Sequence, residues 1–271
     1  MRLSCLQDAA IAQVGVTVHP VSMQARTSVE RGASVSQPIE ATARHLAHWE
    51  VEEERGPAVA IDVIRAFTTA AYAFAAGARA IYLVEQVEEA LAFKRRHPEA
   101  LAMGEERGLM PDGFDFSNSP VRIAEATIAG RTLVQRTSAG TRGALAAAHA
   151  RRLWCASLVC ASATARALAR SELGAPVYVI TGRSRDGKRD GADDLAVAEY
   201  IEQVRRGQPA DADEVARRVL DSQEASLTLR LGAGHVHPDD IRYAARVDAF
   251  SFAMEAKRDA DGLYLVRVDV P

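Results

Sequence analysis

The stretch 57-PAVAIDVIRAFTTAAYAFAAGA-78 contains the structural unit from which most of this chain is built. Its first eight residues are apolar except for Asp62, and several are β-branched, which predicts a short buried strand. The part from 68 to 78 is rich in alanine and aromatic residues and predicts a helix, with Thr68 or Thr69 available to cap its first turn. A strand that enters a helix through a polar turn is the repeating unit of α/β proteins.

The same alternation continues along the chain. Further strands are expected at 80–86, 131–137, 153–159, 175–181 and 263–270. Further helices are expected at 87–98, 139–152, 162–173, 193–206 and 211–225. This order predicts an α/β fold, a layered α/β/α arrangement with a largely parallel or mixed central sheet.

The region before Pro57 has a different character. A strand-like run at 14–20 is followed by a polar, irregular stretch, in which 39–53 is compatible with a short helix. Gly56 and Pro57 then form a turn signal. We therefore expect an N-terminal strand and irregular extension over 1–56, and an α/β domain over 57–271 with room for two subdomains around one site.

Composition excludes several classes of function. Hydrophobic residues make up 48% and charged residues 25% of the 271 residues, as in an ordinary globular protein. The net charge of -3 leaves no basic field for nucleic acid, and no stretch reaches the roughly eighteen apolar residues of a membrane span. Three cysteines without a CxxC pair favour a reducing, cytoplasmic compartment. The sequence leaves a homodimer open.

The first polar turn has two interpretations. Ligands of α/β sheets gather beyond the carboxyl ends of the strands, and Asp62 and Arg65 lie at such an end. A buried aspartate needs a partner, so an Asp62–Arg65 pair with a threonine cap is one interpretation. The other is a metal or phosphate site at the start of the following helix.

The turn 135-QRTSAGTRGA-144 is similarly ambiguous. Small residues, hydroxyl groups and Arg142 suit a phosphate or sulfonate, but an ordinary strand-to-helix turn uses the same residues as caps. Neither GxxxxGK[ST] nor GxGxxG is present.

Two further loops carry charged residues. In the loop 182–194 we expect 185–190 to be solvated, whereas Asp193 and Asp194 open a helix, one as its cap and one toward a metal. The stretch 103-MGEERGLMPDGFDFSNSP-120 has no helical or strand period and is expected to form an active-site rim. Carboxylates and hydroxyl groups without histidine or cysteine clusters favour Mg²⁺ and a small anionic substrate. No GxSxG elbow supports serine hydrolase chemistry.

Four segments in this order, 61–70, 104–120, 137–144 and 192–201, resemble the 2-phosphosulfolactate phosphatase family. Its members carry a DVLRATTT-like turn, a GE–GFD–NSP loop, a TNGT- or SAGT-like turn and a late acidic pair. The resemblance extends from about Ala58 to Val268. It implies a Mg²⁺-dependent phosphatase in an α/β fold that hydrolyses a phosphate ester of a sulfonated or carboxylated three-carbon acid.

The resemblance also implies site residues. The implied catalytic residues are Asp62, Arg65, Glu105, Asp115, Arg142 and Asp194. The implied substrate-binding residues are Thr68, Thr69, Asn118, Ser119, Ser138, Gly140 and Thr141, and Gly113 and Asp193 belong to the same motifs. For the metal we expect Asp62, Glu105 and Asp194. Arg65 and Arg142 would neutralise the phosphoryl charge, and Asp115 or Asp194 would orient the attacking water. This interpretation requires Asp62, Arg142 and Asp194 to converge on the loop 103–120.

The sequence departs from the commonest family pattern at Phe67, Glu106, Ala139 and Cys160. An alternative is therefore another hydrolase, lyase or transferase reaction on a small carboxylate. A third hypothesis is a non-catalytic binder of a small anion, which has little use for several convergent carboxylates.

Overall fold

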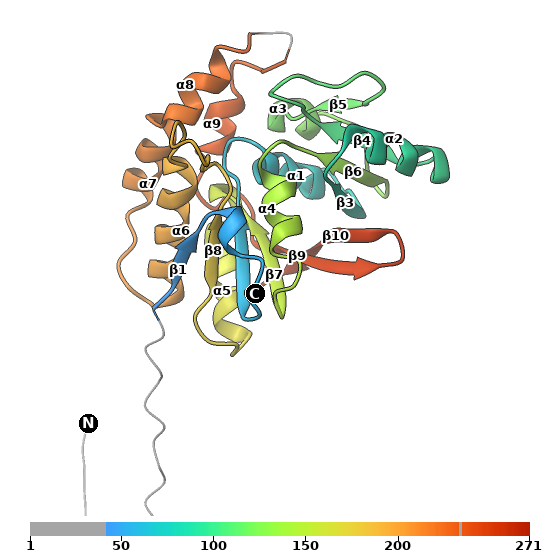
Figure 1. Ribbon diagram of the computed structural model, residues 1–271. Coiled ribbons are helices and arrows are strands. Elements are labelled where there is room, and N and C mark those ends of the chain that lie inside the picture. The colour runs from blue at the N-terminus through green and yellow to red at the C-terminus, as the bar shows by residue number, and fades with distance from the viewer. Residues whose placement is uncertain (1–41, 233–234) are drawn as a thin grey trace, which may run out of the picture. The chain divides into compact units, whose positions relative to one another are not determined.

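The computed structural model describes residues 42–232 and 235–271 (Figure 1). The strands in these residues are β1 (Arg44–Leu46), β2 (Pro57–Ile61), β3 (Ala80–Val84), β4 (Leu101–Gly104), β5 (Phe116–Ser117), β6 (Thr132–Arg136), β7 (Arg152–Ala156), β8 (Val177–Ile180), β9 (Phe252–Asp259) and β10 (Gly262–Asp269). The α-helices are α1 (Ala66–Ala75), α2 (Val87–Arg96), α3 (Pro120–Ala124), α4 (Gly140–Ala146), α5 (Ala161–Arg170), α6 (Ala192–Arg205), α7 (Ala212–Leu220), α8 (Gln223–Leu229) and α9 (Asp240–Ala244). Two 3-10 turns are η1 (His48–Glu50) and η2 (Leu158–Cys160).

All of these strands belong to one mixed sheet in the order β1-β8-β2-β7-β9-β10-β3-β6-β4-β5. Strands β1, β8, β2 and β7 are parallel to one another and form the first half. Strands β3, β6, β4 and β5 are also mutually parallel and form the second half. The antiparallel hairpin β9–β10 joins the two halves by pairing with β7 and β3. The predicted α/β class with a mixed sheet is confirmed.

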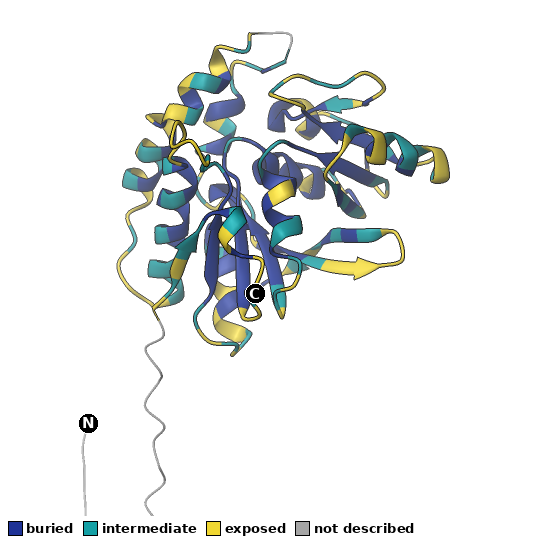
Figure 2. Cartoon of the chain, in the orientation of Figure 1, coloured by how far each residue is buried: buried dark blue, intermediate teal, exposed yellow. Residues whose placement is uncertain are grey.

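The core shows why the central parallel strands β2, β7 and β8 are apolar along most of their length. In β2, Ala58 and Ala60 pack into a cluster with α1 and α4, whereas Val59 and Ile61 pack into a second cluster with α5 and α6. Successive side chains of a strand point to opposite faces, and here helices cover both faces. Strands β2, β7 and β8 are accordingly buried, and the far end of the β9–β10 hairpin is exposed (Figure 2).

Helices α1 and α4 connect the two halves. The cluster around them contains Ala60 from the first half and Ile81 and Leu133 from the second, and α4 contacts both β2 and β3. Helix α1 also carries the chain from β2 to β3, and thus from one half to the other. Loops that follow strands of both halves therefore meet at one place, which becomes the candidate site.

Several elements differ from their predictions. The helix expected at 39–53 is wrong, because residues 44–46 add a short strand beside β8 and His45 packs its ring 5.6 Å from that of Tyr178. The helix expected at 211–225 is two helices, since the side chain of Ser222 caps α8 by accepting a hydrogen bond from the Ala225 amide. Strands β4, β5 and β9 were not predicted. The strand predicted at 14–20 lies outside the described residues.

No helix within residues 42–232 and 235–271 is long and apolar enough to cross a membrane.

Candidate active site

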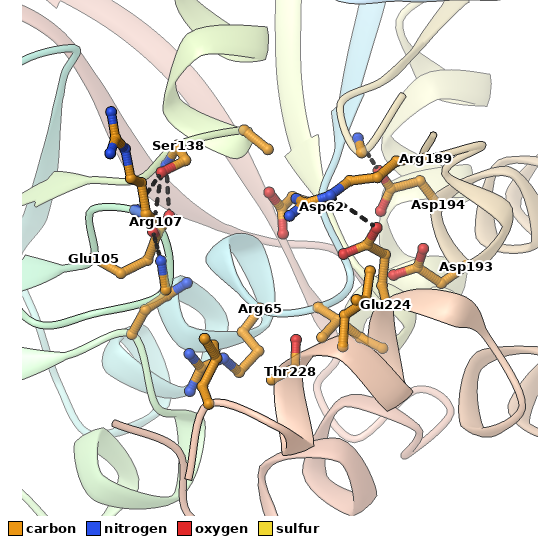
Figure 3. Close-up of a pocket in the computed structure, with 17 residues that line it drawn as sticks. Asp62, Arg65, Glu105, Arg107, Ser138, Arg189, Asp193, Asp194, Glu224 and Thr228 are labelled. Atoms are coloured by element: carbon orange, nitrogen blue, oxygen red, sulfur yellow. Dashed lines mark hydrogen bonds and ion pairs between the residues drawn. The ribbon is translucent and has the colours of Figure 1, made fainter. Parts of the chain in front are cut away.

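A polar cavity of about 330 Å³ lies where loops from both halves of the sheet meet (Figure 3). Asp62 and Arg65 reach it from the turn after β2, Glu105 from the end of β4, and Ser138 from the turn after β6. The opposite wall comes from helices α6 and α8, which supply Asp193, Asp194, Glu224 and Thr228. The cavity is therefore built from the carboxyl ends of parallel strands, as expected for an α/β sheet.

Three buried aspartates, Asp62, Asp193 and Asp194, line one part of this cavity and are called the aspartate cluster below. Asp62 accepts a hydrogen bond from the Ala66 amide at 2.8 Å. Asp194 accepts from the Val63 amide at 2.9 Å and from the Gly182 amide at 2.8 Å. The Thr181 hydroxyl donates to the Ile61 carbonyl at 2.9 Å and lies between the two carboxylates, 3.3 Å from Asp62 Oδ2 and 3.4 Å from Asp194 Oδ2.

The aspartate cluster has raised pKa values. Burial raises the pKa of Asp62 to about 6 and that of Asp193 to about 8, and nearby carboxylates add to both shifts. Burial, with the charges of Asp193 and Asp62, also raises the pKa of Asp194. Asp193 Oδ1 is buried and has no hydrogen-bond partner among the described residues. Several buried carboxylates at one place are costly to ionise unless a cation accompanies them.

The donor set suits a hard cation. Mg²⁺ commonly takes one or two carboxylates and completes its shell with water and phosphate oxygens. Within residues 42–232 and 235–271, however, no group of three or more His, Cys, Asp or Glu side chains is arranged to hold a metal ion. The predicted ligands Asp62, Glu105 and Asp194 line the same cavity without forming such a group.

Glu105 is held by the loop that follows β4 and by the turn that follows β6. Its Oε1 accepts from the Ser138 amide at 2.5 Å, and its Oε2 accepts from the Gly108 amide at 2.6 Å and from the Ser138 hydroxyl at 3.0 Å. Arg136 Nη1 donates to the Glu105 carbonyl at 2.6 Å. In Figure 3, Glu105 and Ser138 lie on one side of the cavity, Asp193 and Asp194 on the other, and Asp62 between them. Glu105 therefore orders the wall that carries Ser138.

Arg65 has a different partner from the one considered in the sequence. Its Nη1 donates to Asp240 Oδ2 at 2.8 Å and to the His235 carbonyl at 3.3 Å, and both side chains of this ion pair are buried. The expected threonine cap of α1 is also wrong. Asp62 instead accepts a hydrogen bond from the Ala66 amide in the first turn of α1, and the Thr68 hydroxyl donates to the Val63 carbonyl at 2.6 Å.

Several predicted site residues lie outside the cavity. Asp115 accepts hydrogen bonds from the Ala102 amide and from Lys94, both at 2.7 Å. These bonds fasten the loop 103–120 to β4 and α2, in the second half of the sheet. Arg142 is half-exposed and lies 3.8 Å from Glu85, so its predicted convergence on the loop 103–120 is not observed. Thr68, Thr69, Ser119 and Thr141 are buried but do not line the cavity, and Gly140 packs against Asp62 from behind.

Other lining residues were missed in the sequence. Glu224 and Thr228 come from α8, which matches no motif and reaches the cavity only through tertiary packing. Arg189 was assigned to a solvated loop but lines the cavity, 3.7 Å from Glu224. Arg107 follows Glu105 in the loop and lines the mouth.

We predict that Asp115→Asn and Arg142→Ala change kcat/KM for phosphate ester hydrolysis by less than about threefold, because neither side chain lines the cavity. Asp115→Asn should cost about 1 kcal/mol of stability through its weakened hydrogen bonds. Steady-state phosphate release and urea unfolding measure the two effects. A loss of more than about tenfold in kcat/KM at either position would contradict this placement.

Comparison with known proteins gives a consistent result. A family model described as 2-phosphosulpholactate phosphatase matches residues 45–259. A probable 2-phosphosulfolactate phosphatase of Bacillus subtilis (strain 168) is 34% identical over 211 residues, which cover 78% of this chain and 91% of the relative. The proteins of the same description from Thermus thermophilus and Deinococcus radiodurans are 41% and 37% identical, over 65% of this chain and 71% and 70% of their own lengths.

Proposed function

Because the chain belongs to the 2-phosphosulfolactate phosphatase family, we propose that it hydrolyses a phosphate monoester of a small sulfonated or carboxylated acid. The observation that carries this proposal is the aspartate cluster, which opens into one small cavity together with Arg65. A cavity of about 330 Å³ suits a substrate of a few carbon atoms with its phosphate.

The charge of the cavity supports a divalent cation as cofactor, which we propose to be Mg²⁺. Five carboxylates line the cavity, namely Asp62, Glu105, Asp193, Asp194 and Glu224, against three arginines, Arg65, Arg107 and Arg189. Two of these arginines already pair with a carboxylate: Arg65 with Asp240, and Arg189 with Glu224. The aspartate cluster, when ionised, repels a phosphate dianion, so a cation on the cluster would favour both its ionisation and phosphate binding. When bound, such a cation polarises the phosphoryl oxygens and lowers the pKa of a coordinated water.

The three side chains of the aspartate cluster have different proposed roles. Asp62 and Asp194 are oriented by backbone amides, which fixes the direction in which their remaining lone pairs point. We propose that they hold the cation. Asp193 Oδ1, without a hydrogen-bond partner in the described chain, is available to accept a hydrogen bond from the attacking water. It replaces Asp115 in this role, because Asp115 lies outside the cavity.

Phosphate release tests the proposal. The purified protein with Mg²⁺ should release inorganic phosphate from 2-phosphosulfolactate or 2-phospholactate, and chelation should abolish the release. Phosphate released together with an unsaturated acid instead of the hydroxy acid would show a lyase, and ester consumed without free phosphate would show a transferase. Binding of the esters without any turnover would instead indicate a small-anion binder. Either result would overturn the proposed hydrolysis.

The pH dependence of stability gives an independent prediction. Because the pKa values of Asp62 and Asp193 lie near 6 and 8 rather than 3.8, the folded state binds more protons than the unfolded state from about pH 4 to about pH 8. The free energy of unfolding of the metal-free protein should therefore fall as the pH rises through this window. A divalent cation needs ionised carboxylates, so its stabilising effect should grow over the same window.

Differential scanning fluorimetry with and without millimolar MgCl₂, at about pH 6 and about pH 8.5, measures both effects. The Tm gain from Mg²⁺ should be larger at the higher pH. Asp193→Asn should make the metal-free Tm less dependent on pH, because the group with the pKa near 8 is removed. An equal Tm gain at both pH values would contradict cation binding by these carboxylates.

We also propose a reducing, cytoplasmic location. Cys155 and Cys160 are free and buried, and burial raises the pKa of both thiols. Inert buried thiols of this kind need no oxidising compartment.

A further inference from the structure

One part of the cavity wall has a chemistry opposite to that of the aspartate cluster. It consists of Arg65, Asn118 and Thr228, which are 4%, 3% and 8% exposed and all line the cavity. In Figure 3, Arg65 and Thr228 are both drawn in the lower part of the view, apart from Asp193 and Asp194. Guanidinium, amide and hydroxyl groups are hydrogen-bond donors, and none of them carries a negative charge.

The guanidinium of Arg65 has unused donors. Both of its hydrogen bonds, to Asp240 and to the His235 carbonyl, are made by Nη1. Nε and Nη2 make no hydrogen bond to any described residue. Nε and Nη2 form the edge of a guanidinium that pairs with two oxygens of one oxyanion.

Asn118 is a buried amide with unsatisfied hydrogen-bonding capacity. Its Oδ1, an acceptor, is buried without a partner among the described residues, and its Nδ2, the group that can donate to an oxyanion, makes no hydrogen bond to them; the side chain lines the cavity. A buried amide in this state costs free energy unless a ligand or water satisfies it. Asn118 was implied as a substrate residue by its motif, but no group was assigned to it.

A single buried carboxylate, Asp240, positions both Arg65 and the segment that carries Asn118. Asp240 Oδ2 accepts from Arg65 at 2.8 Å, and Oδ1 accepts from the hydroxyl of Ser119, the neighbour of Asn118, at 2.6 Å. The His237 amide donates to Oδ2 at 2.9 Å. The charge of Asp240 is thus shared among several donors, and the free edge of Arg65 remains available to a ligand.

We propose that Arg65, Asn118 and Thr228 form an acid subsite, which binds the sulfonate or carboxylate of the substrate while the aspartate cluster and its cation take the phosphate. This inference rests on the proposed function and adds an orientation to it. A bare oxyanion is repelled by the aspartate cluster and finds free donors at the acid subsite. Asp240 is a positioning residue that orients Arg65 and the Asn118–Ser119 segment.

Three phosphate esters separate the contribution of each group. 2-Phospholactate carries only a carboxylate, 1-sulfopropan-2-yl phosphate carries only a sulfonate, and isopropyl phosphate carries neither. Asn118→Leu removes the amide and keeps a similar volume. It should raise KM for the first two esters about 10- to 100-fold more than KM for isopropyl phosphate, through loss of a charge-assisted hydrogen bond. The ester with the larger increase identifies the acid group that the subsite takes.

Arg65→Lys should show the same pattern with a larger effect, because lysine cannot pair with an oxyanion through two parallel hydrogen bonds. Arg152→Lys is the matched control: Arg152 Nε donates to Glu255 at 2.6 Å, outside the cavity, and the variant should behave as wild type. Asp240→Asn should raise KM for the acid-bearing esters while kcat for isopropyl phosphate is kept. If this fully buried position does not tolerate the change, the Asn118 variant decides alone. Equal losses for all three esters in Asn118→Leu would overturn the acid subsite.

A binding measurement separates this inference from the proposed function. If the wild-type protein hydrolyses none of the esters, the proposed function fails, and calorimetric titration with methanesulfonate and acetate then tests the subsite. Binding by wild type that is lost in Asn118→Leu would support it. Absence of binding, or equal binding by both proteins, would overturn it.

Discussion

Asp62→Asn is expected to lower kcat/KM for phosphate ester hydrolysis by on the order of 10³-fold while the protein remains folded. Asp62 lines the cavity, and the Thr181 hydroxyl lies between its carboxylate and that of Asp194. Asparagine has nearly the same shape and can still accept the hydrogen bond from the Ala66 amide through its carbonyl oxygen. What it lacks is the charge that, in the proposed function, would hold a cation beside the phosphate. The loss should therefore appear mainly in the Mg²⁺ dependence of kcat.

The metal-free variant should also be more stable than the metal-free wild type. The pKa of Asp62, raised to about 6, shows that ionising this carboxyl in the folded state is unfavourable without a cation. Asparagine removes that cost, as expected where stability is given up for function. Asp115→Asn is the matched control, since it makes the same change outside the cavity. Hydrolysis by Asp62→Asn at more than about a tenth of the wild-type rate would show that Asp62 does not serve the cation.

The apolar alternation was sufficient to predict most of the sheet. Strands β2, β7 and β8 are buried on both faces, so each appears in the sequence as a continuous apolar run. Strands β4 and β9 gave weaker signals. β4 ends at Gly104 inside the irregular loop, and β9 ends in charged residues at the exposed hairpin. Their pairing is determined by the neighbouring strands rather than by their own pattern.

The candidate site was predictable only where a motif lies at a strand end. Asp62, Glu105, Ser138 and Asp194 follow strands or open helices, and the structure brings them to one cavity. Asp115 and Arg142 belong to the same motifs but point away, because position in a turn does not determine the direction of a side chain. Glu224 reaches the cavity from a helix more than a hundred residues after Glu105, and only tertiary packing shows this.

Gly104→Ala is expected to cost more than about 3 kcal/mol of stability and to remove activity, although Gly104 does not line the cavity. A Cβ at this position would lie 1.9 Å from the Arg136 carbonyl oxygen, and the φ angle of 140° disfavours any side chain. Gly104 pairs with Arg136 at the end of β4. The next residue, Glu105, donates its amide to the same carbonyl at 2.9 Å and orders the Ser138 wall. Separation of β4 from β6 would therefore displace Glu105 and open the cavity.

Gly130→Ala separates the cost of the positive φ angle from the cost of the steric clash with Arg136. Gly130 also has a positive φ angle, 74°, but a Cβ there would meet no atom within 4 Å. Its cost should be that of the backbone conformation alone, about 1 kcal/mol, with activity retained. Urea unfolding followed by circular dichroism measures both variants, and phosphate release shows whether the cavity survives. If Gly104→Ala is no more destabilising than Gly130→Ala, then the close approach of β4 to Arg136 does not hold Glu105 in place. The side-chain hydrogen bonds between Glu105 and Ser138 must then order this wall alone.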